Sequence, residues 1–419
     1  MRLLIVGGGW AGLSAAVNAT RRGWQVTLLE AARQLGGRAR SVHHQGLRLD
    51  NGQHILIGAY TDTLALMRQV GLDPHRLLHR QTLTLLRPDG SGLTLPSLPA
   101  PWNMLAGVLR ARDWRWKDRA SLLQAAWRWQ RQGFACPPQL TVAQLCTGIS
   151  ERAMAHLIEP LCVSALNTPA EHASAAVFLR VLRDALWSGP GGSDLLLPRV
   201  DLDALLPLAA QQWLVDHGAQ VHLGHRWSPD DACADEHDAL VLACPPWEAA
   251  RLTEQRAPAW SEQAHALTHK AIATVYVRAP TGLTQAWPSP MLALPSDPAH
   301  PAQFVFDRGH LMGADQDRVL ACVVSASEGS REDIQARVMQ QLRHVFSAEM
   351  TPITTVIEKR ATFACVPGLV RPTCGIAPGW WACGDYVQGP YPATLEGAVR
   401  SGREVIDQIA QAREGQGRV

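Results

Sequence analysis

Three glycines near the start of the chain have the spacing G-x-G-x-x-G, which is typical of loops that bind a dinucleotide diphosphate. They are Gly7, Gly9 and Gly12, and Trp10 and Ala11 occupy the positions before the last of them. The first glycine permits a tight turn, the second lets the backbone approach the phosphates, and the third allows close packing of helix on strand. The N–H groups at the start of the following helix would face the phosphates, so the loop predicts an anion site built from backbone.

An acidic side chain lies where the same prediction needs one. Glu30 follows Gly12 by 18 residues, a position at which a carboxylate accepts hydrogen bonds from a pair of ribose hydroxyls. Residues 3–6 predict a buried strand, residues 11–22 a helix, and residues 25–29 a second strand. This strand–helix–strand unit predicts dinucleotide binding, but it does not by itself distinguish FAD from NAD.

Two later segments resemble the cofactor motifs of the flavin amine oxidase and phytoene desaturase superfamily. Residues 35–39 read L-G-G-R-A, and residues 382–385 read A-C-G-D. In that superfamily the arginine and the glycine backbone approach the FAD diphosphate from the side opposite the first loop, and the aspartate binds a hydroxyl of the ribityl–diphosphate region. The residues that the resemblance assigns to this contact are Gly36, Gly37, Arg38, Gly384 and Asp385.

Two further matches to the superfamily extend the predicted cofactor site. Thr394 and Leu395 begin a predicted helix whose N-terminal N–H groups, in the superfamily, point to the flavin pyrimidine oxygen, which gains negative charge on reduction. Val221, in a predicted strand, matches the residue that contacts the adenine through its backbone. The motifs together predict FAD bound along its whole length. Because the sequence contains no second G-x-G-x-x-G, we expect electrons to come from an external donor or from a substrate.

The whole chain resembles a narrower group, the squalene-associated FAD-dependent desaturase family, whose members are described as hydroxysqualene dehydroxylases. Residues 49–60, L-D-N-G-Q-H-I-L-I-G-A-Y, and residues 385–398, with D-Y and G-P-Y-P-A-T-L-E-G-A, carry the likeness. The resemblance implies an apolar C30 isoprenoid substrate and the reductive dehydroxylation of hydroxysqualene to squalene, within squalene and hopanoid biosynthesis. Hydride from reduced flavin N5 would quench an allylic cation in an apolar chamber that excludes water.

Loss of a hydroxyl group needs an acid, because hydroxide is a poor leaving group. The candidates are polar residues of the two family motifs, namely His54, Asp50, Tyr391 and Glu396. Each also has a purely structural interpretation. Asp50 suits a turn in which a carboxylate bonds backbone, His54 a core histidine, Tyr391 an aromatic wall beside the flavin, and Glu396 a cap of its own helix. The sequence does not choose among them.

Three alternatives share the flavin prediction. A phytoene- or squalene-type desaturase would transfer hydride in the opposite direction, and the sequence does not determine that direction. A flavin amine oxidase would place a lysine near flavin N5, but Lys270 has the wrong offset from the strand predicted at residues 273–277. A flavin-binding module without activity is disfavoured, because a substrate domain of full length accompanies the cofactor motifs.

The composition excludes some partners and singles out one segment. The 419-residue chain has a net charge of +2, which does not favour nucleic acid, and its nine cysteines include no C-x-x-C pair. No metal site is expected, and reduced thiols favour the cytoplasm.

Residues 95–135 hold five tryptophans and seven basic residues against two acidic ones. This segment predicts either a peripheral contact with the inner face of the cytoplasmic membrane or a helical cap whose tryptophans line a substrate tunnel.

These patterns predict an α/β fold, the two-domain glutathione-reductase-like FAD-binding (Rossmann) architecture with a mixed helix/sheet substrate domain. The FAD domain is expected from residues 1–80, 193–260 and 362–419. The substrate domain is expected from residues 81–192, mostly helical, and 261–361, richer in strands. Within the FAD domain, residues 202–217 are predicted to form one continuous helix.

Overall fold

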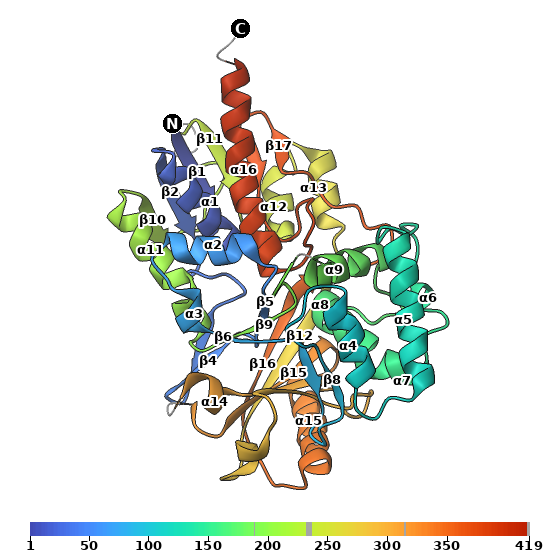
Figure 1. Cartoon of the computed structure of the whole chain (residues 1–419). Helices are drawn as coiled ribbons and strands as arrows, with labels where there is room; N and C mark the ends of the chain where they lie inside the picture. The colour runs from blue at the N-terminus through green and yellow to red at the C-terminus, as the bar shows by residue number, and fades with distance from the viewer. Residues whose placement is uncertain (188, 232–236, 314–315, 417–419) are drawn as a thin grey trace.

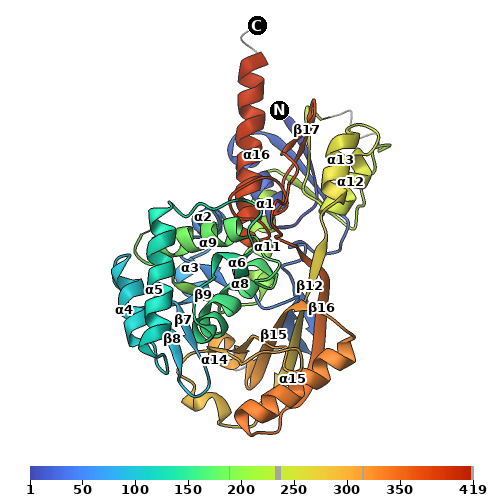
Figure 2. The same cartoon turned by 90° about the vertical axis from the view of Figure 1, so that its right-hand side faces the viewer.

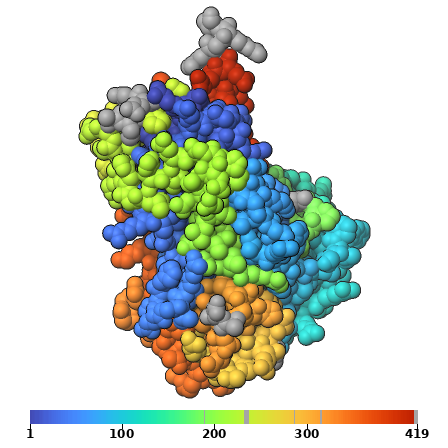
Figure 3. Space-filling view, turned by 90° about the vertical axis from the view of Figure 1, so that its left-hand side faces the viewer, coloured from blue at the N-terminus to red at the C-terminus, as the bar shows by residue number. Residues whose placement is uncertain are grey.

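A six-stranded sheet occupies the upper half of the computed structural model, which describes residues 1–187, 189–231, 237–313 and 316–416 (Figure 1). The strand order is β10-β2-β1-β11-β18-β17, and every neighbouring pair is parallel except β17 with β18. The strands are β1 (Arg2–Val6), β2 (Gln25–Glu30), β10 (Gln220–Leu223), β11 (Ala239–Leu242), β17 (Gly375–Ala377) and β18 (Trp380–Ala382). On the face of the molecule in Figure 3, the blue N-terminal segment and the yellow-green segment lie side by side, although they are far apart in the sequence.

The central strand β1 is apolar because both faces of the sheet are covered. Leu3, Leu4 and Ile5 are fully buried, as expected for a parallel strand between helical layers. The helices α1 (Trp10–Arg21) and α16 (Leu395–Gln416) pack against each other beside it, so the two ends of the chain lie together (Figure 1). A Cβ on Gly402 would lie 2.3 Å from a backbone oxygen of α1, so glycine is needed at this helix crossing.

A second, antiparallel sheet lies below the first (Figure 2). Its order is β13-β14-β15-β12-β16, and the helix α15 (Arg331–Phe346) covers one face. The strands are β12 (His269–Arg278), β13 (Met291–Ala293), β14 (Phe304–Asp307), β15 (Val319–Ser327) and β16 (Thr351–Phe363). The buried side of α15, with Ile334, Val338 and Leu342, belongs to the same apolar cluster as the strand residues Val275 and Leu320.

A helical region lies beside both sheets, at the right of Figure 1. It contains α4 (Trp102–Arg110), α5 (Trp116–Arg131), α6 (Val142–Leu145), α7 (Glu151–Ala153), α8 (Glu159–Leu166) and α9 (Ala175–Trp187). A π-helical turn, Met154–Ile158, joins α7 to α8. No helix in the described ranges is long and apolar enough to cross a membrane.

Short elements connect these layers. Three small sheets pair β3 (Ser41–His44) with β4 (Leu47–Asp50), β9 (Leu195–Pro198) with β5 (Leu56–Ile57) and β6 (Leu78–Gln81), and β7 (Thr84–Leu86) with β8 (Gly92–Thr94). The remaining helices are α2 (Thr61–Gln69), α3 (Pro74–Leu77), α10 (Leu202–Leu205), α11 (Pro207–Asp216), α12 (Pro246–Thr253), α13 (Pro258–His265) and α14 (Arg308–Met312). The exact domain boundaries remain predictions.

The single helix predicted over residues 202–217 is wrong. The chain forms α10 and α11 with a break at Leu206, whose φ and ψ are −154° and −52°. The cause is Pro207, which lacks an N–H group for the helical ladder and disfavours helical geometry in the residue before it. Pro207 instead begins α11, a position at which proline needs no hydrogen-bond partner.

Candidate functional site

Two glycine loops meet backbone to backbone above the carboxyl end of β1. The N–H of Gly36 donates to the carbonyl of Gly8 at 2.9 Å, and a Cβ on Gly37 would lie 3.1 Å from the Cα of Gly9. Gly36 and Gly37 have φ of +104° and +62°, which side chains rarely permit. A side chain at Gly37 would therefore press on the backbone of the first loop.

The first glycine loop leads into α1 without a side-chain cap. Gly7 has φ of +114°, and a Cβ there would lie 2.7 Å from the backbone of Ala243. A Cβ on Gly12 would lie 1.9 Å from the carbonyl of Gly7, so strand and helix can touch only through glycine. No side chain in the described ranges caps α1 at Gly9. The amides of its first turn therefore suit an anionic ligand, and the cradle fits a dinucleotide diphosphate.

Trp10 and Ala11 are buried, so each can offer only backbone to a ligand. The indole N–H of Trp10 donates to the carbonyl of Ala39 at 3.1 Å, and this hydrogen bond links α1 to the second glycine loop. Ala11 lies at the crossing with α16, where its carbonyl faces Gly402. The Trp10 side chain thus helps to hold the two loops together, and Ala11 lies at the helix crossing.

Glu30 lies at the end of β2, beside the first glycine loop. Its carboxylate accepts from the N–H of Gly8 at 2.6 Å and from the N–H of Ala32 at 2.7 Å. A carboxylate has about four acceptor sites, so it can still accept from ribose hydroxyls. Val221 pairs with Leu28 in the middle of the strand ladder, two residues before the end of β10, and its adenine contact stays a prediction.

Arg38 and Asp385 bring the two superfamily motifs into direct contact. A guanidinium nitrogen of Arg38 lies 2.5 Å from a carboxylate oxygen of Asp385, and a second donates to the carbonyl of Ala361 at 2.7 Å. The N–H of Gly384 donates to the hydroxyl of Ser401 on α16 at 2.8 Å. These contacts join the second glycine loop, the end of β18 and α16 at one place.

The N-terminus of α16 lies at this junction. The hydroxyl of Thr394 caps the helix by accepting from the N–H of Gly397 at 3.0 Å, and Leu395 is the first helical residue. The N–H of Ala393 donates to the carbonyl of Asp385 at 3.2 Å. The remaining N–H groups of this first turn suit an anionic ligand atom, and their predicted contact with the flavin pyrimidine oxygen stays a prediction. A small cavity here is lined by Asp385, Tyr391 and Gly397, among others.

Asp50 is committed to a buried ion pair. Its carboxylate lies 2.8 Å from the guanidinium of Arg308 and accepts from the N–H of Leu202 at 2.9 Å. The two side chains are 3% and 0% exposed, and the hydroxyl of Tyr276 donates to the Asp50 carbonyl at 2.9 Å. This pair links the β3–β4 hairpin to the antiparallel sheet. Arg308 carried no local signal in the sequence, because its partner is 258 residues away.

His54 lies on the segment that borders Arg38. The amide of Asn51 donates to the carbonyl of Arg38 at 3.0 Å and to the carboxylate of Glu358 at 2.9 Å, which fixes the segment against the second glycine loop. The Nδ1 of His54 lies 3.0 Å from the carbonyl of Gly52, an acceptor, so Nδ1 carries the proton and Nε2 offers a lone pair. Burial lowers the pKa of the His54 imidazole, although Asp50 nearby opposes that shift.

Glu396 caps a helix, but not the helix that contains it. Its carboxylate accepts from the N–H groups of Asp62 and Thr63 at 3.0 and 2.9 Å and from the Thr63 hydroxyl at 2.7 Å. It therefore satisfies the N-terminus of α2, not that of α16. Burial raises the pKa of the carboxyl, and the side chain is fully enclosed by protein.

Tyr391 lies between α9 and α16 and remains partly exposed. Its hydroxyl hydrogen-bonds to Asp184, and its ring meets that of Tyr60 edge-on at 6.4 Å between centroids. Burial, followed by the Asp184 charge, raises the pKa of Tyr391 to about 12. The tyrosine therefore keeps its proton at neutral pH. Asp184 was not among the predicted site residues, since only the tertiary contact identifies it.

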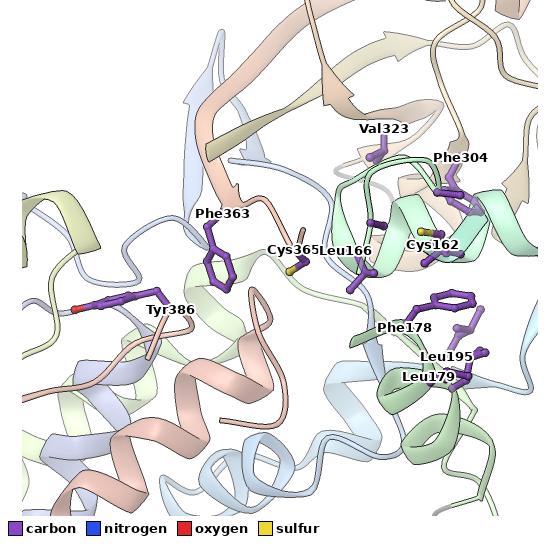
Figure 4. Close-up of a cluster of buried hydrophobic side chains, with 14 of the residues drawn as sticks. Cys162, Leu166, Phe178, Leu179, Leu195, Phe304, Val323, Phe363, Cys365 and Tyr386 are labelled. Carbon is purple, nitrogen blue, oxygen red and sulfur yellow. The ribbon is translucent and has the colours of Figure 1, made fainter. Parts of the chain in front are cut away.

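A cluster of buried aromatic, aliphatic and thiol side chains begins next to this junction. It runs from Tyr386, directly after Asp385, through Phe363 and Cys365 to Phe178 and beyond (Figure 4). Figure 4 places Phe304 and Val323 of the antiparallel sheet at its far end. Burial raises the pKa of the Cys365 thiol to about 12, so it stays protonated. The protein interior on this side of the junction is therefore apolar.

The arrangement separates the four predicted acids into two groups. A proton donor must be reachable by its substrate, and the carboxylates of Asp50 and Glu396 are enclosed by protein and used in structural bonds. His54 and Tyr391 are partly exposed. Within the described ranges, no cluster of three or more metal-ligating side chains occurs.

A family model described as flavin containing amine oxidoreductase matches residues 10–410. The chain is 25% identical to the hydroxysqualene dehydroxylase of Zymomonas mobilis subsp. mobilis, over 96% of this chain and 97% of that protein. It is 26% identical to the hydroxysqualene dehydroxylase of Rhodopseudomonas palustris, over 97% and 98%. A local match to a zeta-carotene desaturase of Zea mays reaches 31% identity but spans 29% of this chain and 22% of that protein.

Solved structures of oxidoreductases share the fold. An oxidoreductase from Methanosarcina mazei superposes with a TM-score of 0.69 at 13% identity, covering 97% of this chain and 100% of its own. Cyclohexylamine oxidase from Brevibacterium oxydans gives a TM-score of 0.68 at 16% identity, covering 99% of each chain. The predicted two-domain FAD-binding architecture is thereby confirmed.

Proposed function

The chain belongs to the family of flavin-containing amine oxidoreductases and is an FAD-dependent oxidoreductase, and from this premise we propose that it reduces hydroxysqualene to squalene. The observation that carries the proposal is the similarity to hydroxysqualene dehydroxylases over 96–97% of the chain. The narrower substrate class, an apolar C30 isoprenoid, follows from the same relatives.

The apolar cluster beside the cofactor junction supports this substrate class. Squalene-type hydrocarbons have no charge to pair, so the free energy of binding must come from burial of apolar surface, at about 25 cal/mol per Å². Tyr386, directly after Asp385, and Phe363 are the aromatic residues at the near end of this cluster, and Phe178 lies farther along it. Bound FAD in its reduced state supplies a hydride. An apolar enclosure also keeps water from capturing the cation that forms when the hydroxyl leaves.

His54 is the proton donor in this proposal, because it alone combines accessibility with a position beside Arg38. When protonated, a partly desolvated imidazolium is a stronger acid than one in water, and it can pass its Nε2 proton to the departing hydroxyl. The C–O bond breaks to give water, and a new C–H bond forms, so the substrate gains a hydride and loses hydroxide. In this proposal Tyr391 orients the departing hydroxyl or lines the substrate site.

Anaerobic single-turnover reaction tests the proposal directly. Photoreduced, FAD-loaded enzyme mixed with hydroxysqualene should show reoxidation of the flavin absorbance together with squalene, detected by mass spectrometry. Photoreduction makes the test independent of the external electron donor, which we propose as the physiological source of electrons. Enzyme that keeps its FAD but stays reduced in the presence of hydroxysqualene would exclude this function.

Two controls separate the alternatives. Oxidised enzyme that is reduced by squalene would identify a desaturase, and oxidised enzyme that is reduced by an alkylamine would identify an amine oxidase. His54→Gln should lower the single-turnover rate at least about a hundredfold, as expected for loss of an acid catalyst, while FAD stays bound. His75→Gln alters a histidine exposed on α3 and should react like the wild type. Wild-type rates in His54→Gln would remove His54 from the mechanism.

A further inference from the structure

Exposed apolar side chains are concentrated in one segment of the chain. Nine large hydrophobic residues are exposed in the described ranges, and five of them lie between residues 98 and 127. They are Leu98, Trp102, Leu109, Trp116 and Trp127. The three tryptophans are 62%, 72% and 58% exposed, and the other four exposed residues are Leu208, Val215, Leu223 and Val370. We call these five residues, on and just before α4 and α5, the tryptophan surface.

The helix α5 has two distinct apolar faces. Asp118, Leu122, Ala125 and Trp129 are buried and face the protein core. Trp116 and Trp127 are 11 residues apart, about three helical turns, so they share the opposite face. A helix that only covers a core would place polar residues on that face. The outer tryptophans therefore have no explanation in the packing of this chain.

The neighbouring helix α4 repeats the arrangement. Trp102 and Leu109 lie seven residues apart, about two turns, and face outward, while Gly107 and Val108 face the core. The two helices pack against each other and form the outer edge of the helical region in Figure 2. Each of the two neighbouring helices therefore carries exposed tryptophan. Trp114, by contrast, is 5% exposed and belongs to the core.

The charge around the tryptophan surface is positive. Arg110, Arg112, Lys117 and Arg131 are exposed, and none of them lies within 4.0 Å of a carboxylate in the described ranges. Both acids of this segment are used elsewhere. Asp113 pairs with Arg152 at 2.7 Å, and Asp118 accepts from the backbone at the start of α5. The guanidinium of Arg131 lies over the Trp127 ring, 4.8 Å from its centroid.

We infer that the tryptophan surface docks the protein on an anionic lipid bilayer. Tryptophan favours the interface between headgroups and acyl chains, where its ring is apolar and its N–H can bond to water or lipid. Lysine and arginine beside it attract anionic headgroups, and their aliphatic stems tolerate partial insertion. Helices that lie at a membrane surface combine outward tryptophans with cations that have no protein partner, and α4 and α5 have both features.

The lipid is favoured over a second copy of this chain by charge. An interface between two copies would bring the same unpaired cations together, which repel, because the two acids that could neutralise them are already bonded. An anionic bilayer removes that repulsion. This inference concerns a surface and does not require hydroxysqualene to be the substrate, so it can fail or hold independently of the proposed function.

Vesicle flotation tests the inference with the FAD-loaded enzyme. Wild-type protein should float with phosphatidylglycerol-containing vesicles, bind phosphatidylcholine vesicles more weakly, and be released by salt. The triple variant W102S/W116S/W127S should lose at least about tenfold in the partition coefficient, because its apolar insertion surface is gone. The variant R110Q/R112Q/K117Q/R131Q should retain weak binding but lose the preference for anionic lipid.

A matched control keeps the test specific. Leu208 and Val215 are 50% and 52% exposed and lie on α11, on the opposite side of Figure 1 from α4 and α5, so L208S/V215S should float like the wild type. Circular dichroism and retained FAD verify that each variant is folded. Equal flotation of the tryptophan variant and the wild type would overturn the inference, as would a wild type that never floats. A wild-type dimer that the tryptophan variant abolishes, without flotation, would assign the surface to self-association.

Discussion

Replacement of Arg308 by methionine should destabilise the protein strongly, because it leaves the Asp50 carboxylate buried without a counterion. Arg308 is fully buried, lies 2.8 Å from Asp50, and also donates to Gln316 at 3.1 Å and to Gln53 at 3.3 Å. Removal of one partner from a buried pair costs about 3–5 kcal/mol. With a urea m-value of about 3 kcal/mol/M, the unfolding midpoint should fall by about 1–1.7 M.

A double variant distinguishes the ion pair from simple loss of packing. D50N/R308M removes both charges, and the amide that replaces the Asp50 carboxylate would keep an oxygen to accept from the N–H of Leu202. It should recover at least about half of the lost stability, since an uncharged pair no longer carries the cost of an unpaired buried charge. Urea unfolding of FAD-loaded protein, followed by circular dichroism, measures both variants. A single variant that loses less than about 1 kcal/mol, or a double variant less stable than R308M, would refute the reasoning.

Three further predictions address the cofactor cradle, one titrating group and one remote cap. Gly37→Ala should weaken FAD binding at least about tenfold in a flavin fluorescence titration, because its Cβ would press on the first glycine loop. The control Gly23→Ala should affect stability alone, since Gly23 has φ of +74° but a Cβ there would meet no atom within 4 Å. The folded-state pKa of His54 is lowered from 6.5, so the unfolded chain binds the extra proton. Wild-type thermal stability should therefore fall as pH drops through about 6.5, and more steeply than in His54→Gln, and parallel melting curves would contradict this. Glu396→Ala should lower the free energy of unfolding in urea by about 2–4 kcal/mol, because three donors at the start of α2 lose their acceptor. Single-turnover activity per bound FAD should persist. Loss of activity in folded, FAD-loaded protein would return Glu396 to the catalytic candidates.

The cofactor side of the site could be predicted closely, because its requirements are local. A positive φ or a backbone contact that excludes Cβ demands glycine, so Gly7, Gly12 and Gly37 identify such positions in the sequence itself. Strand and helix boundaries around them follow from apolar runs of a few residues. The same kind of local evidence was present at Pro207, where proline signalled the break between α10 and α11.

The polar residues of the site could not be sorted in the same way, because their partners are distant in the chain. Asp50 meets Arg308, 258 residues later, and Glu396 caps α2, 333 residues earlier. A carboxylate looks the same in sequence whether it neutralises a buried guanidinium, caps a helix or faces a substrate. Only the fold determines which of these it does, since burial and partner set its protonation and its reach.

The tryptophans show the same division between sequence and structure. Composition alone marked residues 95–135 as rich in tryptophan and basic residues, and left a membrane contact and a tunnel lining both open. The packing of α4 and α5 placed Trp114 and Trp129 in the core and Trp102, Trp116 and Trp127 on the outside. The sequence by itself determined the flavin-binding backbone, because glycine geometry is a property of single residues. The tertiary structure alone decided which acids are free and which tryptophans are exposed, because burial is a property of the whole fold.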